Sequence, residues 1–272
     1  MLVNRLLVAI VLLPLGIAAI ALGGLAYAAV IMILLGLAAW EYVGLFRAGG
    51  WQPAGVVVIG GTLALLVGRG VDGFTSAPWI LSLIFLVSMA YHLVAYERGR
   101  DQAGTDFAIT LAGILYLGWI GGYFISLRNL PDGKWWVLVA LPAVWLADSG
   151  AYVFGTRFGR HKITPRLSPK KSWEGYLGGI PVAVLGTAGL AALWAWAAGP
   201  GVSLTAWSGA ALGLAMGVLT ILGDLGESML KRQVGMKDSS NLLPGHGGFL
   251  DRVDSWLWAS VIGYYLIVWF FL

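Results

Sequence analysis

The sequence predicts an all-α protein that crosses a membrane about nine times and folds as a single domain. Of its 272 residues, 59% are hydrophobic and 11% are charged, about half the charged fraction of an average soluble domain. The apolar residues form runs long enough to cross the roughly 30 Å hydrocarbon core of a bilayer. The 40 glycines indicate helices that pack closely through small residues. Since the chain has no cysteine, disulfides, thiolate nucleophiles and Cys-ligated metals are excluded.

Nine apolar runs are the expected membrane spans. They cover residues 4–22, 25–46, 53–71, 77–96, 105–126, 135–156, 174–198, 205–230 and 253–271. The first run follows Arg5 and has the length of a signal peptide, but a second run follows almost at once and no polar domain appears. We therefore interpret the first run as a retained span.

The basic residues predict how the chain is oriented. An odd number of spans places the termini on opposite faces, and 14 of the 17 Lys and Arg residues fall on the face of the N terminus. The three exceptions are Arg69, Arg128 and Lys134. Because cytoplasmic loops carry an excess of Lys and Arg, the N terminus is expected in the cytoplasm and the C terminus outside. Ten of these 14 residues lie in two loops, and this concentration favours an anionic ligand there. The alternative, attraction to anionic lipid headgroups, would explain the sign of the charge but not its concentration in two loops.

The end of the eighth predicted span carries a polar stripe. Helical spacing at i, i+3, i+4 and i+7 places on one face Asp224, Glu227, Ser228 and Lys231. A carboxylate at mid-membrane costs roughly 2.5 to 3.5 kcal/mol, so such a group is expected to face a partner or a polar cavity. The plainer alternative is an ion pair between Glu227 and Lys231, which leaves Asp224 unexplained.

Three other polar residues fall in or near the spans. Asp148 lies inside the sixth run with Tyr152 one turn later. It is either hydrogen-bonded between helices or, as we favour, lines the same cavity as Asp224. Glu41 and His92 are single polar groups near the ends of runs, and we interpret both as structural or snorkelling side chains.

The segment before the ninth span is the richest in polar residues. Lys237 and Asp238 precede a glycine-rich stretch around His246, and Asp251 and Asp254 follow at i and i+3. Glycines allow backbone N–H groups to approach an anion, and the two aspartates offer oxygen ligands for a hard metal ion. The plainer interpretation is that the two acids only compensate the dipole at the start of a helix. The presence of a third acid, Asp224, makes that interpretation weaker.

The other basic loop, between the sixth and seventh spans, contains prolines that exclude a continuous helix. Ser172 is a predicted N-cap of the seventh span, with Glu174 in the first turn. Lys170 and Lys171 would then stand at a helix entrance near the membrane surface, a position suited to a lipid phosphate or a nucleoside triphosphate. The alternative is that these lysines only anchor the topology.

Two segments resemble a known family. Residues 228–254, SMLKRQVGMKDSSNLLPGHGGFLDRVD, resemble the signature of phosphatidate cytidylyltransferases, also called CDP-diacylglycerol synthases. The stretch SPKKSWEG from Ser168 is similar to a second basic motif of that family, with Ser172 where Thr is frequent. The resemblance covers about residues 145–254. It implies scaffold and lipid-access spans within residues 1–130, and catalytic spans within residues 135–271.

The resemblance implies magnesium-dependent transfer of CMP from CTP to phosphatidate, with release of pyrophosphate. Because a phosphate monoester is already ionised, the main difficulty is bringing two polyanions together. The implied catalytic residues are Asp224, Asp251, Lys237 and His246. The implied ligands of Mg²⁺, or of two metal ions, are Asp224, Asp251, Glu227 and Asp254. The implied substrate-binding residues are Lys170, Lys171, Ser172, Lys231, Arg232, Asp238, Gly247, Gly248, Arg252 and Asp148.

The same polar residues are compatible with two other functions. A CTP-dependent lipid or polyprenol kinase needs similar groups but leaves CDP, and a membrane transporter also uses intramembrane carboxylates. The expected partners are CTP, phosphatidate and membrane lipids; the Gly-rich helices permit a homodimer, and no nucleic-acid module is present. The resemblance places the protein in the bacterial cytoplasmic membrane with its active site facing the cytoplasm.

Overall fold

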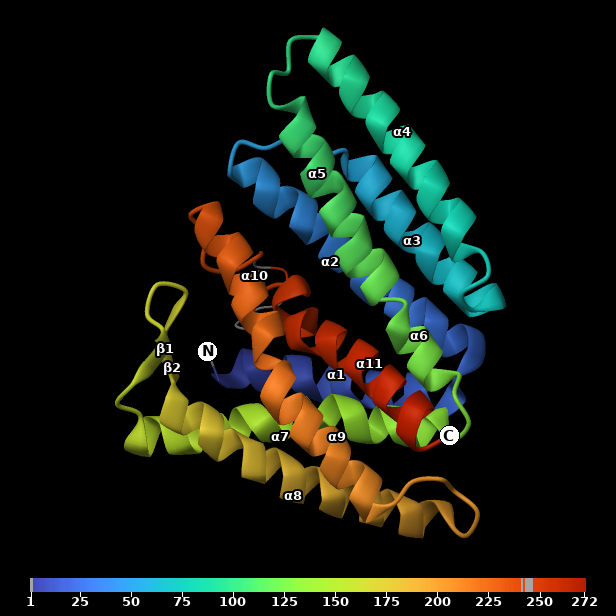
Figure 1. Ribbon diagram of the computed structural model, residues 1–272, viewed down its shortest axis with the longest axis vertical. Coiled ribbons are helices and arrows are strands. Elements are labelled where there is room, and N and C mark those ends of the chain that lie inside the picture. The colour runs from blue at the N-terminus through green and yellow to red at the C-terminus, as the bar shows by residue number, and fades with distance from the viewer. Residues whose placement is uncertain (1, 241, 243–246) are drawn as a thin grey trace. The chain divides into compact units, whose positions relative to one another are not determined.

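A computed structural model of the protein describes residues 2–240, 242 and 247–272, and it is helical throughout apart from one small hairpin (Figure 1). The elements in chain order are α1 (Leu2–Leu22), α2 (Gly24–Ala48), α3 (Gly55–Asp72), α4 (Ala77–Glu97), α5 (Ala103–Gly113), the π-helix η1 (Ile114–Ile120), α6 (Tyr123–Arg128), α7 (Gly133–Phe158), β1 (Lys162–Thr164), β2 (Ser168–Ser172), α8 (Trp173–Ala198), α9 (Ala206–Leu219), α10 (Ile221–Gln233) and α11 (Leu250–Phe270).

Helices occupy all nine predicted spans. In the described part of the chain, eight helical segments are long and apolar enough to cross a membrane. The first predicted span is α1, whose assessed apolar stretch is the shorter Leu12–Leu22. The prediction of an all-α, multi-pass integral membrane protein is thus confirmed. The orientation of the termini stays a prediction.

Two of the spans are not single regular helices. The fifth runs through α5, η1 and α6, with a π-helical turn at Ile114–Ile120. The eighth is divided at Thr220 into α9 and α10. The Thr220 hydroxyl donates a hydrogen bond to the carbonyl oxygen of Met216 at 2.7 Å, a bond of the kind that bends helices. The polar stripe predicted from Asp224 onward therefore lies on its own helix, α10.

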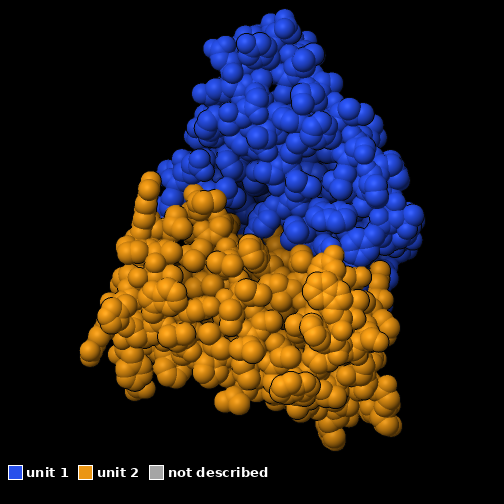
Figure 2. Space-filling view, viewed as in Figure 1, with its two compact units in different colours: residues 1–126, 230–253 blue, residues 127–229, 254–272 orange. Residues whose placement is uncertain are grey.

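The chain forms two compact units, which Figure 2 colours separately. Unit 1 comprises Met1–Ser126 and Leu230–Val253, and unit 2 comprises Leu127–Met229 and Asp254–Leu272. The sequence placed residues 135–271 together as the catalytic part; in the structure, residues 230–253 pack with the N-terminal helices instead. Helix α10 is divided between the two units. The single domain stays a prediction.

Unit 1 has an apolar core that includes a buried polar network around Asp106. Asp106 accepts hydrogen bonds from Nε of Arg100 at 2.7 Å and from the backbone N–H of Gln52 at 2.8 Å. The hydrogen bond to Asp106 raises the pKa of the Arg100 guanidinium. His92 is 3% exposed and contacts Thr110 Oγ1 through Nε2 at 3.0 Å, as its interpretation as a structural residue requires.

Unit 2 is held together by small residues on α7, α8 and α9. A Cβ at Gly179 of α8 would lie 2.6 Å from the carbonyl oxygen of Ala147 on α7, and one at Gly213 of α9 would lie 2.5 Å from that of Ala183 on α8. Since real Cβ atoms do not approach so closely, glycine is required at these crossings. The predicted packing of helices through glycine is confirmed.

Candidate active site

The loop between α7 and α8 is a β-hairpin that presents two lysines. Strands β1 and β2 pair antiparallel, with Lys162 opposite Ser172, and the hairpin stands where α7 ends and α8 begins (Figure 1). The Ser172 hydroxyl accepts the backbone N–H of Gly175 at 3.3 Å, so Ser172 is the N-cap of α8 as predicted. Lys170 and Lys171 therefore sit on β2 immediately before a helix N-terminus.

The carboxylate of Glu174 fastens the other side of this hairpin. It accepts the backbone N–H of Arg160 at 3.0 Å and that of His161 at 3.2 Å, and it lies 2.5 Å from His161 Nδ1. The backbone N–H of Trp173 also donates to the carbonyl oxygen of His161 at 2.9 Å. The residues immediately before β1 are thereby tied to the first turn of α8.

A pocket of about 240 Å³ opens in unit 2 beside this hairpin, and we call it the polar pocket because two lysines and an aspartate line it among apolar residues. Its lining includes Asp148 of α7, Lys170 and Lys171 of β2, and the N-cap Ser172. Small residues such as Gly155, Gly175 and Gly179 form much of the remaining wall. Four of the residues predicted to bind substrate therefore line one pocket.

Lys171 joins this pocket to α10. Its ammonium forms an ion pair with Oδ2 of Asp224, whose Oδ1 accepts a hydrogen bond from the Ser228 hydroxyl at 3.4 Å. Asp148 interacts electrostatically with both Lys171 and Asp224. The preferred interpretation of Asp148, a cavity-lining acid near Asp224, agrees with this arrangement.

A second predicted metal ligand, Asp254, lies at the helix crossing next to Asp224. A Cβ on Gly223 would lie 2.7 Å from the carbonyl oxygen of Asp254 and 3.0 Å from the Cα of Ser255. Helices α10 and α11 thus touch backbone to backbone one residue before Asp224. Oδ1 of Asp254 accepts the backbone N–H of Ser255 at 2.6 Å.

In unit 1, Asp251 is the centre of a tight group of contacts. Its Oδ1 lies 2.6 Å from Nζ of Lys231. Its Oδ2 accepts the backbone N–H of Ser239 at 3.0 Å, the Ser239 hydroxyl at 2.8 Å and the backbone N–H of Gly248 at 2.7 Å. The side chains of Lys231 and Asp251 are 11% and 7% exposed. Asp251 thus holds a cation and also organises the segment that precedes it.

Glu41 of α2 is the residue whose connection to the site the sequence did not reveal. It is 1% exposed and accepts hydrogen bonds from the hydroxyls of Ser239 and Ser240 and from the backbone N–H groups of Phe249 and Leu250. The interpretation of Glu41 as a structural residue agrees with these contacts. The residues that it binds belong to the segment 228–254, which resembles the family signature and is called the family-like segment below. An acid inside an apolar run was the available signal; its partners could not be found because they lie 198 to 209 residues away.

The paired glycines of that segment are explained by these carboxylates. Gly247 has φ +78°, where side chains are strained, and a Cβ on it would meet Oδ2 of Asp251 at 2.7 Å. A Cβ on Gly248 would lie 2.7 Å from the carboxyl carbon of Glu41. The anion that the Gly248 N–H contacts in this structure is Asp251 itself.

The remaining predicted site residues are placed as follows. Arg232, Lys237, Asp238 and Arg252 are exposed, and Nη1 of Arg232 donates to the carbonyl oxygen of Met236 at 3.1 Å. Glu227 on α10 is buried, with 1% exposure. His246 lies outside the described residues. Among residues 2–240, 242 and 247–272, no group of three or more His, Asp or Glu side chains is arranged to hold a metal ion.

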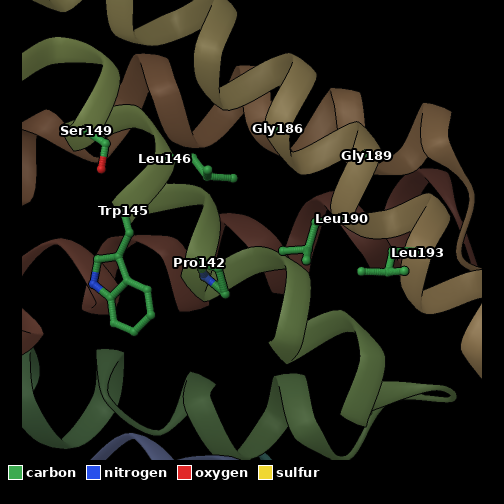
Figure 3. Close-up of a pocket in the computed structure, with 8 residues that line it drawn as sticks. All are labelled: Pro142, Trp145, Leu146, Ser149, Gly186, Gly189, Leu190 and Leu193. Atoms are coloured by element: carbon green, nitrogen blue, oxygen red, sulfur yellow. The ribbon is translucent and has the colours of Figure 1, made fainter. Parts of the chain in front are cut away.

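An apolar cavity of about 330 Å³ lies on the same two helices as the polar pocket (Figure 3). Trp145, Leu146 and Ser149 of α7 line it with Leu190 and Leu193 of α8. It also borders Gly186 and Gly189. Because α7 and α8 are membrane-spanning helices, this cavity faces an environment rich in acyl chains.

Comparison with known proteins supports the resemblance and extends it along the chain. The sequence matches the profile of the cytidylyltransferase family over residues 3–270. It is 36% identical to the phosphatidate cytidylyltransferase of Pseudomonas aeruginosa, over 99% of this chain and 97% of that protein. It is 31% identical to the phosphatidate cytidylyltransferase of Synechocystis sp., over 97% and 96%, and 42% identical to that of Bacillus subtilis, over 73% and 71%. Since the match spans both units, the chain belongs to the cytidylyltransferase family.

Proposed function

We propose that this protein transfers CMP from CTP to phosphatidate, giving CDP-diacylglycerol and pyrophosphate, at the cytoplasmic face of a bacterial cytoplasmic membrane. The observation that carries the proposal is the ion pair between Lys171 and Asp224 beside the polar pocket. This ion pair brings the basic motif of the α7–α8 hairpin next to the acidic residues of α10. An enzyme with two anionic substrates needs basic groups to bind their phosphates and acidic groups to bind a metal ion. The names of the relatives supply the reaction and the substrates.

The reaction is a substitution at phosphorus. A phosphate oxygen of phosphatidate attacks the α-phosphorus of CTP, and the bond from that phosphorus to the oxygen bridging to the β-phosphate breaks. Pyrophosphate leaves with the bonding electrons, and the new diphosphate links cytidine to the lipid. No proton must be removed from the nucleophile, so the protein's task is to hold the two anions in line and offset their repulsion.

Lysines and arginines would neutralise much of the negative charge of the two substrates. We assign the phosphatidate headgroup to Lys170, Lys171 and Ser172, which line the polar pocket with Asp148. The phosphates of CTP are assigned to Lys231, Arg232, Lys237 and Arg252, three of which are exposed. Asp238, His246, Gly247 and Gly248 complete the assignment as groups near the leaving pyrophosphate.

A magnesium ion is assigned to the acidic residues. Asp224 and Asp251 each pair with a lysine ammonium, which supports binding of a cation by each carboxylate. We propose them as ligands of Mg²⁺, with Glu227 and Asp254 as ligands of the same or a second ion. Magnesium is usually bound by one or two carboxylates together with substrate phosphates and water, so a larger acidic cluster is not required. When bound, the ion would neutralise phosphate charge and polarise the α-phosphorus.

The lipid tails are assigned to the apolar cavity of Figure 3. Helices α7 and α8 contribute to both cavities: Asp148 lines the polar one, and Trp145 and Ser149 line the apolar one. An acyl chain of a phosphatidate whose headgroup lies at Lys171 would run along these two helices. This places the charged and apolar parts of one substrate on one pair of helices.

The proposal is tested with purified protein in detergent, phosphatidate, Mg²⁺ and CTP labelled in the cytosine ring. Labelled lipid and pyrophosphate should appear in equal amounts, and Asp224→Asn and Asp251→Asn should abolish both. Asp101→Asn, an exposed acid of the α4–α5 loop, is the control and should keep full activity. Conversion of labelled CTP to labelled CDP, with no label in the lipid, would identify a lipid kinase. Untouched CTP with folded protein would contradict both enzymes and favour a transporter.

A further inference from the structure

The strongest unassigned feature is the bonding of Glu41 to the family-like segment. Glu41 is in α2, in the part of the chain that the sequence treated as scaffold, and it is 1% exposed. Its Oε1 accepts the Ser240 hydroxyl at 2.6 Å and the Phe249 N–H at 3.0 Å. Its Oε2 accepts the Ser239 hydroxyl at 3.2 Å and the Leu250 N–H at 2.8 Å. A single buried carboxylate therefore satisfies four donors.

These four donors come from two separate parts of the segment. Ser239 and Ser240 lie shortly after α10, whereas Phe249 and Leu250 are at the beginning of α11. The first N–H groups of a helix have no partner inside the helix and carry its positive dipole. Glu41 supplies that partner from another helix, and in doing so fixes the distance between the two parts of the segment.

The contacts of Glu41 also determine the position of Asp251. Leu250 is bonded to Glu41 and is followed directly by Asp251, whose Oδ2 accepts the N–H groups of Ser239 and Gly248. The Ser239 hydroxyl lies within hydrogen-bond distance of both acids, 3.2 Å from Glu41 Oε2 and 2.8 Å from Asp251 Oδ2. Glu41 and Asp251 thus share one hydroxyl, that of Ser239, as their common donor.

We propose that Glu41 is a positioning residue for the transfer reaction: by holding both parts of residues 239–250, it sets the position of Asp251. The assignment rests on the proposed function, since Asp251 is a catalytic residue only if that function is correct. Glu41 touches no substrate itself. Its effect on catalysis passes through the backbone at Phe249 and Leu250.

The Glu41 carboxylate leaves no space for a side chain at position 248. A Cβ on Gly248 would lie 2.7 Å from the carboxyl carbon of Glu41. A larger residue at 248 would therefore push the carboxylate away from the α11 N-terminus, and Gly248→Ala is expected to reproduce the effect of changing Glu41.

Glu41→Gln is the sharpest variant, because it keeps the size of the side chain. Each carboxylate oxygen faces one backbone donor, Oε1 the Phe249 N–H and Oε2 the Leu250 N–H. Whichever way the amide is turned, its NH₂ group meets a backbone N–H that cannot rotate away. Glu41→Asp keeps two acceptor oxygens on a shorter stem and is the conservative variant that should restore part of the function.

Tyr42→Phe is the matched control. Tyr42 is the next residue of α2, is 2% exposed and donates its hydroxyl to the carbonyl oxygen of Ile109 at 2.9 Å. Its loss removes one hydrogen bond from the same helix, and this bond goes to α5 and not to Ser239, Ser240, Phe249 or Leu250. It reports what general loosening of α2 would do.

The first readout is hydrogen exchange of the full-length protein in detergent, which needs no activity. Glu41→Gln should speed exchange at Phe249 and Leu250 by about tenfold or more, the effect expected for loss of one hydrogen bond to a charged group. Tyr42→Phe should leave these two amides as in the wild type. Equal exchange in Glu41→Gln and wild type would overturn the proposal, whatever the enzyme does.

The second readout separates kcat from KM in the assay of labelled lipid. Glu41→Gln should lower kcat by about tenfold or more with a smaller change in the KM for CTP, and Glu41→Asp should recover part of the kcat. A kcat for Glu41→Gln equal to that of Tyr42→Phe would overturn the proposal. If the wild type itself makes no labelled lipid, the proposed function fails, and exchange alone decides whether Glu41 is an anchor.

Ser240→Ala decides the matter if Glu41→Gln does not fold. This change removes the Ser240 hydroxyl, which donates to Glu41 and accepts the backbone N–H of Leu242 at 3.1 Å. The bonds from the Phe249 and Leu250 N–H groups to Glu41 stay in place. Faster exchange at Ser239 and Ser240 with a kcat lowered by about tenfold, as for loss of a hydrogen bond to a charged group, supports the anchor. Exchange and kcat equal to the wild type in Ser240→Ala would overturn it.

Discussion

Nζ of Lys231 lies 2.6 Å from Oδ1 of Asp251, and both side chains are largely buried. Removing one member of a buried ion pair leaves the other charge uncompensated, which costs about 3 to 5 kcal/mol. Lys231→Met is therefore expected to lower the thermal midpoint of unfolding in detergent clearly, and to abolish transfer. The double variant Lys231→Met with Asp251→Asn should regain stability but no activity. Recovery of activity in the double variant would contradict the roles assigned to both residues.

The pair between Lys171 and Asp224 should behave differently, because its side chains are 24% and 36% exposed. Exposed pairs contribute about 0 to 1 kcal/mol to stability, so Lys171→Met should leave the unfolding midpoint nearly unchanged. It should nevertheless lower kcat/KM for phosphatidate by about tenfold to a hundredfold, since it removes a charge from the polar pocket. Lys162→Met, on the neighbouring strand β1 but outside the pocket lining, is the control. An equal loss in both variants would mean that the hairpin's overall charge matters, and not Lys171 in particular.

Removal of divalent cations should stop the reaction reversibly. With excess chelator, formation of labelled lipid should fall below about 1% of its starting rate and return when Mg²⁺ is added in excess, because charge neutralisation by the metal is worth several kcal/mol. Asp224→Glu should keep some activity with a higher Mg²⁺ concentration at half-maximal rate. Full activity after exhaustive chelation would remove the metal from the proposal and leave the lysines and arginines to balance the phosphate charge.

Gly189 lines the apolar cavity on α7 and α8. A Cβ there would meet nothing within 4 Å, so Gly189→Leu is the substitution chosen to fill the cavity. If an acyl chain occupies the cavity, this variant should raise the KM for long-chain phosphatidate severalfold and leave the KM for a short-chain analogue unchanged. Gly60→Leu, at an equally open glycine of α3, is the matched control. The same KM values in both variants would place the acyl chains elsewhere.

The spans could be predicted from the sequence because the bilayer imposes their length. Apolar runs of about 20 residues have few other uses, and helices were found in all nine. The N-cap at Ser172 was equally accessible, since capping depends on residues three apart in the chain. The break at Thr220 and the π-helix at Ile114–Ile120 were not predictable, because apolar composition is the same for a regular and an irregular helix.

The sequence suggested residue types for a site, but only some of the pairings that the structure shows. Spacing along one helix could suggest Glu227 as a partner of Lys231, but could not suggest Asp251, which lies 20 residues further on. Asp148 and Lys171 could be nominated separately, whereas their common pocket depends on how α7, α8 and β2 pack. Glu41 was furthest from reach, since no local pattern relates it to residues some 200 positions later.

The packing of residues 230–253 with the N-terminal helices also restricts how this protein can be recombined. A hybrid gene joined near residue 127 would take α2 from one parent and the segment around Asp251 from another. Such a hybrid would need an acid at position 41 whose reach matches the incoming α11 N-terminus. Exchanges that keep Met1–Ser126 and Leu230–Val253 from one parent avoid that mismatch, so crossover points for chimeric enzymes are better chosen in pairs than singly.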